Sequence, residues 1–307
     1  MGINLFGGAG VSLSMGHHGP MHAQRHRGSA TPGDDGGSAT IGTAVHTPPR
    51  VTSFRSRRAA LNEAQQEVWD RLWPSLGRQA IPTDGDVRPL DAKTWFGRRD
   101  TGGQERSDPG MDTGGQERSD PGMDTGGQAR SGGLVLEIGC GTGTSTLAMA
   151  QSEPDIDVVA VEVYRRGLAQ LLSAIDREGV TNIRLVRGDG IDVLERLVGP
   201  QSLTGVRVFF PDPWPKSRHH KRRLLQPATV ALIADRLRPG GVLHAATDHA
   251  GYAEQIADVG DGEPRLRRVH PDESLPISVH RPTTKYETKA RDAGSSVTEL
   301  LWIRRNG

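Results

Sequence analysis

The second half of the chain alternates between short apolar runs and longer segments with the apolar spacing of amphipathic helices. The runs are apolar on both faces, and one helical segment separates each run from the next, which is typical of parallel strands in βαβ units. The sequence therefore predicts an α/β fold, with helices on both faces of a largely parallel sheet. We expect strands at residues 134–138, 158–163, 183–186, 206–210 and 242–246, and helices at 144–151, 166–179, 191–198 and 227–237.

Two further apolar runs lie near the end of the chain, at residues 266–269 and 297–303, without a convincing helical pattern between them. They predict a C-terminal antiparallel hairpin, which brings the mostly parallel sheet to seven strands. Upstream, an apolar stripe from Leu61 to Leu76 predicts a helix with Asn62 as its N-cap and Gln65 at the capping-box position. We assign this helix to an N-terminal helical extension over residues 51–99.

Two segments carry no apolar periodicity. Residues 1–50 mix Gly, Ser, Thr, Pro and His, a composition that buries too little apolar surface to offset the entropy of ordering, so we expect a disordered tail. Residues 100–132 contain a 12-residue repeat, because the sequence of 100–111 recurs identically at 112–123. This segment predicts a low-complexity surface loop, and residues 133–307 are the predicted main domain.

Composition changes this picture only slightly. The 307 residues are 34% hydrophobic and 4% aromatic, a lean average that fits one α/β domain joined to unpacked segments. No apolar run is long enough to span a bilayer, and the single cysteine, Cys140, excludes an internal disulfide framework, so we expect a soluble, cytoplasmic protein. The formal net charge of +1, taken alone, argues against a nucleic-acid partner.

The first predicted strand runs directly into a glycine-rich turn, Glu137-Ile-Gly-Cys-Gly-Thr-Gly143. Glycine is needed where the backbone approaches a ligand closely or takes a positive φ, and open α/β sheets bind ligands at such strand ends. The alternation of Gly139, Gly141 and Gly143 does not match the dinucleotide-binding pattern, and no Lys-Ser/Thr pair follows as in a P-loop. The turn therefore indicates a nucleotide-like ligand of another kind.

Acidic residues lie at the ends of three successive predicted strands. Glu137 ends the first; Glu162 ends the second, where a carboxylate can accept both hydroxyls of a ribose; and Asp189 ends the third, near the expected place of an adenine. Each acid alone is equally typical of a helix N-cap or a solvated turn. Combined with the glycine turn, the three acids resemble the S-adenosylmethionine site of class I methyltransferases.

The fourth predicted strand ends in a proline-rich turn followed by a basic run. In Pro211-Asp212-Pro213-Trp214 each proline fixes φ and restricts the residue before it, so Asp212 is held at the strand end. The basic run has two interpretations. It is either a solvated surface loop or a set of phosphate contacts, and its position directly after the turn at the strand end favours phosphate contacts beside an active site. Its eight residues include five Lys or Arg and two His: Lys216, Arg218, His219, His220, Lys221, Arg222 and Arg223.

Together these motifs resemble the bacterial tRNA (guanine-N7)-methyltransferase family. The likeness rests on the glycine turn, on the Pro-Asp-Pro-Trp turn with its basic run, on Thr247-Asp248, and on Thr284-Lys-Tyr-Glu287. It covers about residues 50–99 and 133–307, and it implies a Rossmann-like class I methyltransferase fold. It also implies methyl transfer from S-adenosylmethionine, leaving S-adenosylhomocysteine, to N7 of a guanine in the variable loop of tRNA, without a metal.

The resemblance further implies a role for each matching residue, with Asp212 as the catalytic residue that also lines the cofactor site. The other residues expected to bind the cofactor are Glu137, Gly139, Gly141, Gly143, Glu162 and Asp189. Those expected to contact the substrate guanine are Lys216, Asp248, Thr284, Lys285, Tyr286 and Glu287. Contacts to the RNA are expected from Arg218, His219, His220, Lys221, Arg222 and Arg223. Whether the enzyme is a monomer or a homodimer stays open.

Other functions remain compatible with the residues themselves. A methyltransferase that acts on another RNA or on a small molecule would share the cofactor end, although a small molecule gives no reason for the basic run. A non-catalytic RNA-binding protein would leave the strand-end acids unexplained. The distribution of charge, unlike the net charge, favours a nucleic-acid partner, because acids gather at the strand ends and bases gather in one run.

Overall fold

The structure is a computed structural model that describes residues 60–82, 87–97, 132–283, 287 and 296–306. All of them belong to one compact unit within residues 55–307. The predicted disordered tail and nearly all of the repeat segment lie outside the described residues. Thr284, Lys285 and Tyr286, three of the expected substrate contacts, also lie outside them.

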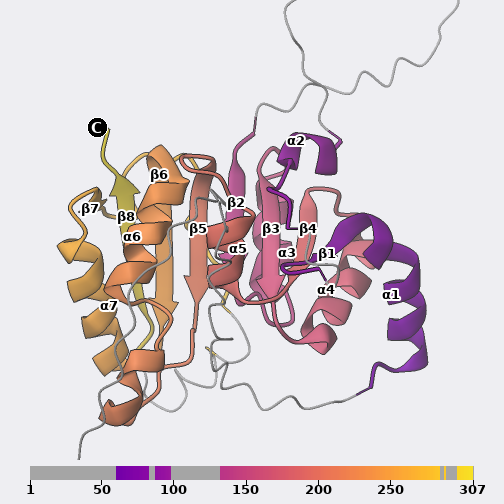
Figure 1. The fold of residues 1–307 in the computed structure, drawn as a ribbon, viewed down its shortest axis with the longest axis horizontal. Helices are drawn as coiled ribbons and strands as arrows, with labels where there is room; N and C mark the ends of the chain where they lie inside the picture. The colour runs from indigo at the N-terminus through magenta and orange to yellow at the C-terminus, as the bar shows by residue number, and fades with distance from the viewer. Residues whose placement is uncertain (1–59, 83–86, 98–131, 284–286, 288–295, 307) are drawn as a thin grey trace, which may run out of the picture. The chain divides into compact units, whose positions relative to one another are not determined.

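An eight-stranded sheet in the order β1-β4-β3-β2-β5-β6-β8-β7 forms the centre of the domain (Figure 1). Its first six strands in this order are parallel, β8 is antiparallel to β6, and β7 is antiparallel to β8. The strands are β1 (Gly77–Gln79), β2 (Leu134–Ile138), β3 (Asp157–Glu162), β4 (Ile183–Arg187), β5 (Leu203–Phe209), β6 (Leu237–Thr247), β7 (Leu266–Arg268) and β8 (Thr298–Arg304). The carboxyl ends of the parallel strands therefore lie along one edge, which we call the carboxyl edge.

Helices cover both faces of the sheet, and an apolar core lies on each face (Figure 1). One core contains buried side chains of α5 (Gly190–Arg196), α6 (Pro227–Arg236) and α7 (Ala250–Gly262), and α2 (Ala92–Trp95) packs against it. The other contains side chains of α1 (Glu63–Leu76), α3 (Thr144–Ser152) and α4 (Arg165–Glu178). Strands β3 and β5 are buried along their whole length, as expected when both faces are covered.

The predicted α/β fold, with helices on both faces and antiparallel C-terminal strands, is confirmed. The predicted capping box is also present, since Gln65 N–H donates to the Asn62 side chain at 2.8 Å. The predicted count of seven strands is wrong, because the sheet has an eighth strand, β1, at its edge. The structure also adds the helix α7. Strand β1 consists of Gly77, Arg78 and Gln79, which carry no apolar side chain for periodicity to detect, and α7 contains three glycines, which lower helix propensity.

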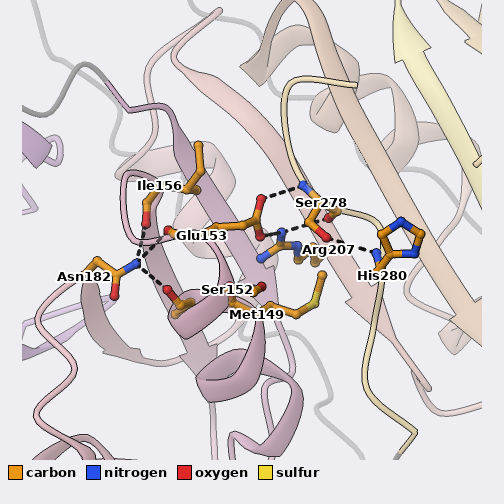
Figure 2. A network of polar contacts seen from close by, with 9 residues as sticks. Met149, Ser152, Glu153, Ile156, Asn182, Arg207, Ser278 and His280 are labelled. Atoms are coloured by element: carbon orange, nitrogen blue, oxygen red, sulfur yellow. Dashed lines mark hydrogen bonds and ion pairs between the residues drawn. The ribbon is translucent and has the colours of Figure 1, made fainter. Parts of the chain in front are cut away.

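One buried amide ties the end of α3 to the sheet. The Asn182 side chain donates through Nδ2 to the carbonyls of Ala150, Glu153 and Ile156, at 2.9, 3.1 and 2.8 Å (Figure 2). The last carbonyls of a helix have no hydrogen-bond partner within the helix. The Asn182 amide, which is buried, donates to carbonyls at this helix end in place of water. The contact fixes the position of Glu153, whose side chain holds a second segment described below.

Candidate active site at the carboxyl edge of the sheet

The glycine turn after β2 takes a backbone shape that only glycine adopts easily. Gly139, Gly141 and Gly143 have φ angles of +80°, +57° and +78°, all in the left-handed region. A Cβ at Gly139 or Gly141 would meet no atom within 4 Å, so this part of the turn faces open space. Cys140 between them is buried, and burial raises the pKa of its thiol well above the usual value, so it packs as an apolar group.

Glu162 at the end of β3 holds this turn in place. One carboxylate oxygen accepts the Gly141 N–H at 3.0 Å, and the other accepts the N–H groups of Val163 and Tyr164 at 2.7 and 3.0 Å. The backbone N–H groups of Gly139 and Cys140 also bond to Val161 O on β3. The structure thus brings the predicted glycine turn and the predicted acid together and shows a structural role for Glu162, while its contact to a cofactor stays a prediction.

The other two predicted cofactor acids differ in their surroundings. Glu137 in β2 is 3% exposed, and its Oε2 has no hydrogen-bond partner within the described part of the chain. Burial raises the pKa of Glu137, while the positive charge of Arg207 on the neighbouring strand opposes this shift. Asp189 after β4 is half-buried and caps α5, because its Oδ1 accepts the Ile191 N–H at 2.8 Å.

Asp212 lies exposed on a strained turn that follows β5. Phe210 and Trp214, on either side of it, have φ angles of +50° and +44°, which non-glycine residues rarely adopt. Such strain persists only where the surrounding contacts hold it. The Phe210 N–H bonds to Ala246 O on β6 at 2.8 Å, and the Trp214 ring lies under Arg222, 5.1 Å from the guanidinium carbon to the ring centroid. The turn therefore fixes Asp212, as its prolines predict.

The basic run forms a short 3₁₀ helix, η1 (Ser217–Arg222), next to this turn. Lys216, Arg218, Lys221 and Arg222 are exposed, and His219 and His220 are half-buried. Partial burial and the nearby positive charges, Arg222 first among them, lower the pKa of His219, whose ring meets the Trp214 ring edge-on at 5.5 Å. Most of the run is thus available for contacts outside the protein.

The prediction that Arg223 contacts RNA is wrong, because this side chain is buried at 3% exposure inside the fold. Its guanidinium donates to Pro213 O at 2.7 Å, to Gly251 O at 3.1 Å and to the Gln255 side chain at 2.7 Å, and it lies 4.7 Å from the Tyr252 ring centroid. Arg223 therefore ties the Asp212 turn to α7. The sequence does not reveal this, because Arg222 and Arg223 are the same residue type in one basic run.

The remaining predicted substrate residues lie after β6 and before β8. Asp248 is exposed directly after β6, the strand that pairs with β5, so Asp212 and Asp248 follow neighbouring parallel strands. Glu287 is 2% exposed, and its carboxylate pairs with Arg281 at 2.7 Å. Burial alone lowers the pKa of Arg281, but Glu287 and Glu299 together raise it above the usual value. Four buried or paired residues are missing from the predicted site: Arg207, His244, Arg281 and Glu299. Arg207 and His244 carry a visible signal, because each is a basic residue inside the apolar run of β5 or β6.

The described residues contain no cluster of three or more His, Cys, Asp or Glu side chains with the geometry of a metal site. Nor does any helix among them have the length and apolarity to cross a membrane. The site consists of a glycine turn, strand-end carboxylates and an exposed basic helix along the carboxyl edge. A sheet of this topology with such a site defines a Rossmann-like, class I methyltransferase.

Comparisons with known proteins narrow the class further. Residues 131–300 match a family model described as "Putative methyltransferase". The chain is 59% identical over 297 residues to a tRNA (guanine-N(7)-)-methyltransferase of Mycolicibacterium paratuberculosis, covering 95% of this chain and all of the relative. It is 62% identical over 305 residues to the protein of that description in Mycolicibacterium vanbaalenii, covering 94% and 98%. The chain belongs to the tRNA (guanine-N(7)-)-methyltransferase family.

Solved structures are more distant. An rRNA methylase from Streptococcus thermophilus superposes with a TM-score of 0.39 at 14% identity, covering 57% of this chain and 88% of that chain. A putative methyltransferase from Thermoplasma acidophilum gives a TM-score of 0.38 at 16% identity, covering 57% and 70%. The fold assignment above therefore rests on the strand order of this protein and on the family match.

Arg222 and Arg223 offer a matched pair for testing the buried contact. We expect Arg223→Met to lower the free energy of unfolding by about 2–4 kcal/mol, because it removes a buried guanidinium that donates to the carbonyls of Pro213 and Gly251. Arg222→Met changes an exposed side chain that stacks on Trp214, and it should lower this free energy by less than about 1 kcal/mol. Urea unfolding followed by circular dichroism measures both, and equal stabilities of the two variants would contradict the assigned role of Arg223.

Proposed function

We propose that this enzyme transfers the methyl group of S-adenosylmethionine to N7 of a guanine in the variable loop of tRNA. The observation that carries the proposal is the exposed Asp212 on its strained turn after β5, the strand that pairs with β2 and its glycine turn, with the basic helix η1 following directly in the chain. A carboxylate for the base, a backbone cradle for a nucleoside and a phosphate-binding surface then share the carboxyl edge. The identity of the relatives supports the same reaction.

The cofactor end fits a nucleoside with a charged tail. The glycine turn faces open space, and the buried Glu137 offers an acceptor without a partner among the described residues. When bound, S-adenosylmethionine supplies an electrophilic methyl group on a sulfonium centre. The residues that would hold it are Glu137, Gly139, Gly141, Gly143, Glu162, Asp189 and Asp212. Glu162 would serve twice, since it also fixes the Gly141 backbone.

The guanine end needs positioning more than proton transfer. N7 of guanine carries a lone pair and requires no deprotonation, so the protein has to align the base with the methyl donor and exclude water, which can contribute about 7–11 kcal/mol. Asp212 would stabilise the positive charge that N7 gains, and Asp248 would accept a hydrogen bond from the guanine N1 or its exocyclic amine. Lys216 and the segment from Thr284 to Glu287 would complete the contacts to the base.

The RNA would lie across the exposed basic surface of η1 and its flanks, formed by Lys216, Arg218, His219, His220, Lys221 and Arg222. These side chains would bind phosphates without reading sequence. A-form stems hide N7 in a deep, narrow groove, which favours a guanine in a loop and agrees with a variable-loop target. A tRNA substrate in turn implies that the enzyme works in the cytoplasm.

Another RNA substrate is the alternative that the same basic surface supports. Phosphate contacts do not distinguish one folded RNA from another, so the choice between tRNA and another RNA is left to the assay. A small-molecule substrate has less support, because it would leave four exposed Lys and Arg side chains beside Asp212 without a function.

We expect labelled S-adenosylmethionine to transfer its methyl group to unmodified bacterial tRNA, with strand cleavage at N7-methylguanine locating the product in the variable loop. Asp212→Ala should abolish transfer and still bind tRNA, because it removes the carboxylate beside the base. The control is Asp258→Ala, which alters an exposed aspartate on α7 and should keep full activity. Absence of label in tRNA would refute the proposed substrate, and full activity of Asp212→Ala would refute its role.

Arg222 tests the proposed RNA surface separately. Each phosphate contact releases counterions, so Arg222→Met should weaken tRNA binding and reduce the slope of log affinity against log salt by about 1. Arg196→Met on α5 is the matched control, since this exposed arginine lies outside the basic run. Filter binding between low and moderate salt gives both slopes, and a wild-type slope for Arg222→Met would remove this residue from the interface.

A further inference from the structure

A segment after β7 crosses back over the sheet and is anchored by a buried ion pair. We call residues 277–281 the anchor segment. Glu153 at the end of α3 accepts the Ser278 N–H at 2.5 Å and pairs with Arg207 at 2.5 Å, and Arg207 also donates to Ser278 O at 3.1 Å (Figure 2). Ile277 and Val279 on either side are buried in the apolar core. The backbone of this segment is therefore fixed up to Arg281.

Arg281, the last residue of the anchor segment, joins two other carboxylates. Its Nη1 donates to Glu287 at 2.7 Å and its Nη2 donates to Glu299 on β8 at 3.0 Å. The side chains of Arg281 and Glu287 are 1% and 2% exposed. Glu299 is held in turn by His244 of β6 at 2.9 Å. Arg281 thus connects Glu287, an expected substrate contact, to the centre of the sheet.

The same guanidinium also covers the strained turn. It lies 4.9 Å from the ring centroid of Phe210 and 5.6 Å from that of Phe209. Phe210 has the φ of +50° and stands two residues before Asp212. Stacking of a planar cation on an aromatic ring contributes to holding such a conformation. One side chain therefore contacts both the Asp212 turn and the carboxylate of Glu287.

We propose that Arg281 is a positioning residue for methyl transfer, which fixes the Asp212 turn and Glu287 relative to each other at the guanine end of the site. This inference rests on the proposed function, because it assigns both groups to the guanine. The buried ion pairs of Arg281 are poorly explained by stability alone, because apolar residues of similar volume often stabilise a fold just as well. The geometry of an arginine explains them better, because a planar guanidinium can bind two carboxylates and stack on an aromatic ring at the same time, which a lysine cannot do.

The test compares Arg281→Lys with the wild-type enzyme and with Arg267→Lys, which alters an exposed arginine paired with Glu273 at 3.0 Å. A displacement of about 1 Å at a reacting centre costs on the order of 100-fold in rate. We expect Arg281→Lys to lower kcat with tRNA about 10- to 100-fold. Its KM for tRNA and its calorimetric Kd for S-adenosylmethionine should change far less than kcat, because the basic helix, the glycine turn and the strand-end acids other than Asp212 are untouched. Arg267→Lys should change none of these quantities.

Two results would overturn the inference alone: an unchanged kcat in Arg281→Lys, or a parallel loss of kcat and cofactor affinity, which marks a purely structural role. A wild-type enzyme that binds S-adenosylmethionine without methylating tRNA would instead refute the proposed function and the inference with it. If Arg281→Lys does not fold, Glu299→Gln replaces it in the test, because the glutamine keeps an oxygen acceptor for Arg281 but removes the negative charge. For Glu299→Gln, a lower kcat with little change in cofactor affinity supports the inference, and a wild-type kcat overturns it.

Discussion

The fold buries charged side chains in the middle of its sheet, and the rest of the site depends on how these charges are paired. Glu137, Arg207 and His244 lie in register on the neighbouring strands β2, β5 and β6. A buried charge costs several kcal/mol unless a partner or hydrogen bonds compensate it. Arg207 finds its partners in Glu153 and the Ser278 carbonyl, and His244, whose pKa burial lowers, bonds to Glu299. The pairing thus determines where α3, the anchor segment and β8 lie.

The Asp212 turn and Glu287, which we assign to the guanine, are both held by buried arginines to which we assign no contact with the substrate. Arg223 binds the backbone at Pro213 and joins the Asp212 turn to α7, while Arg281 stacks on Phe210 and binds Glu287. The positive φ values around Asp212 are maintained by these contacts. In our account the protein divides the work between exposed basic residues, which bind RNA, and buried basic residues, which keep the carboxylates in place.

The sequence predicts the features that depend on local pattern and on the geometry of parallel sheets. Alternating apolar runs predict the sheet, and acids such as Glu162 and Asp189 come together because parallel strands end at one edge. Strand β1 was missed because it has no apolar residue, and Arg223 was misassigned because its burial depends on a contact with α7. The pairing of Arg207 with Glu153, 54 residues away, has no local signature at all, since only the folded sheet brings the two together.

Amide hydrogen exchange of the anchor segment tests most directly whether the buried charges hold it. In Glu153→Ala the Ser278 N–H loses its carboxylate acceptor, and a hydrogen bond to a charged group contributes roughly 1.5–3 kcal/mol, or about 10- to 100-fold in exchange rate. We predict faster exchange by this factor in residues 277–281, with unchanged exchange in β2 and β3. Wild-type protection of the anchor segment in this variant would contradict the account.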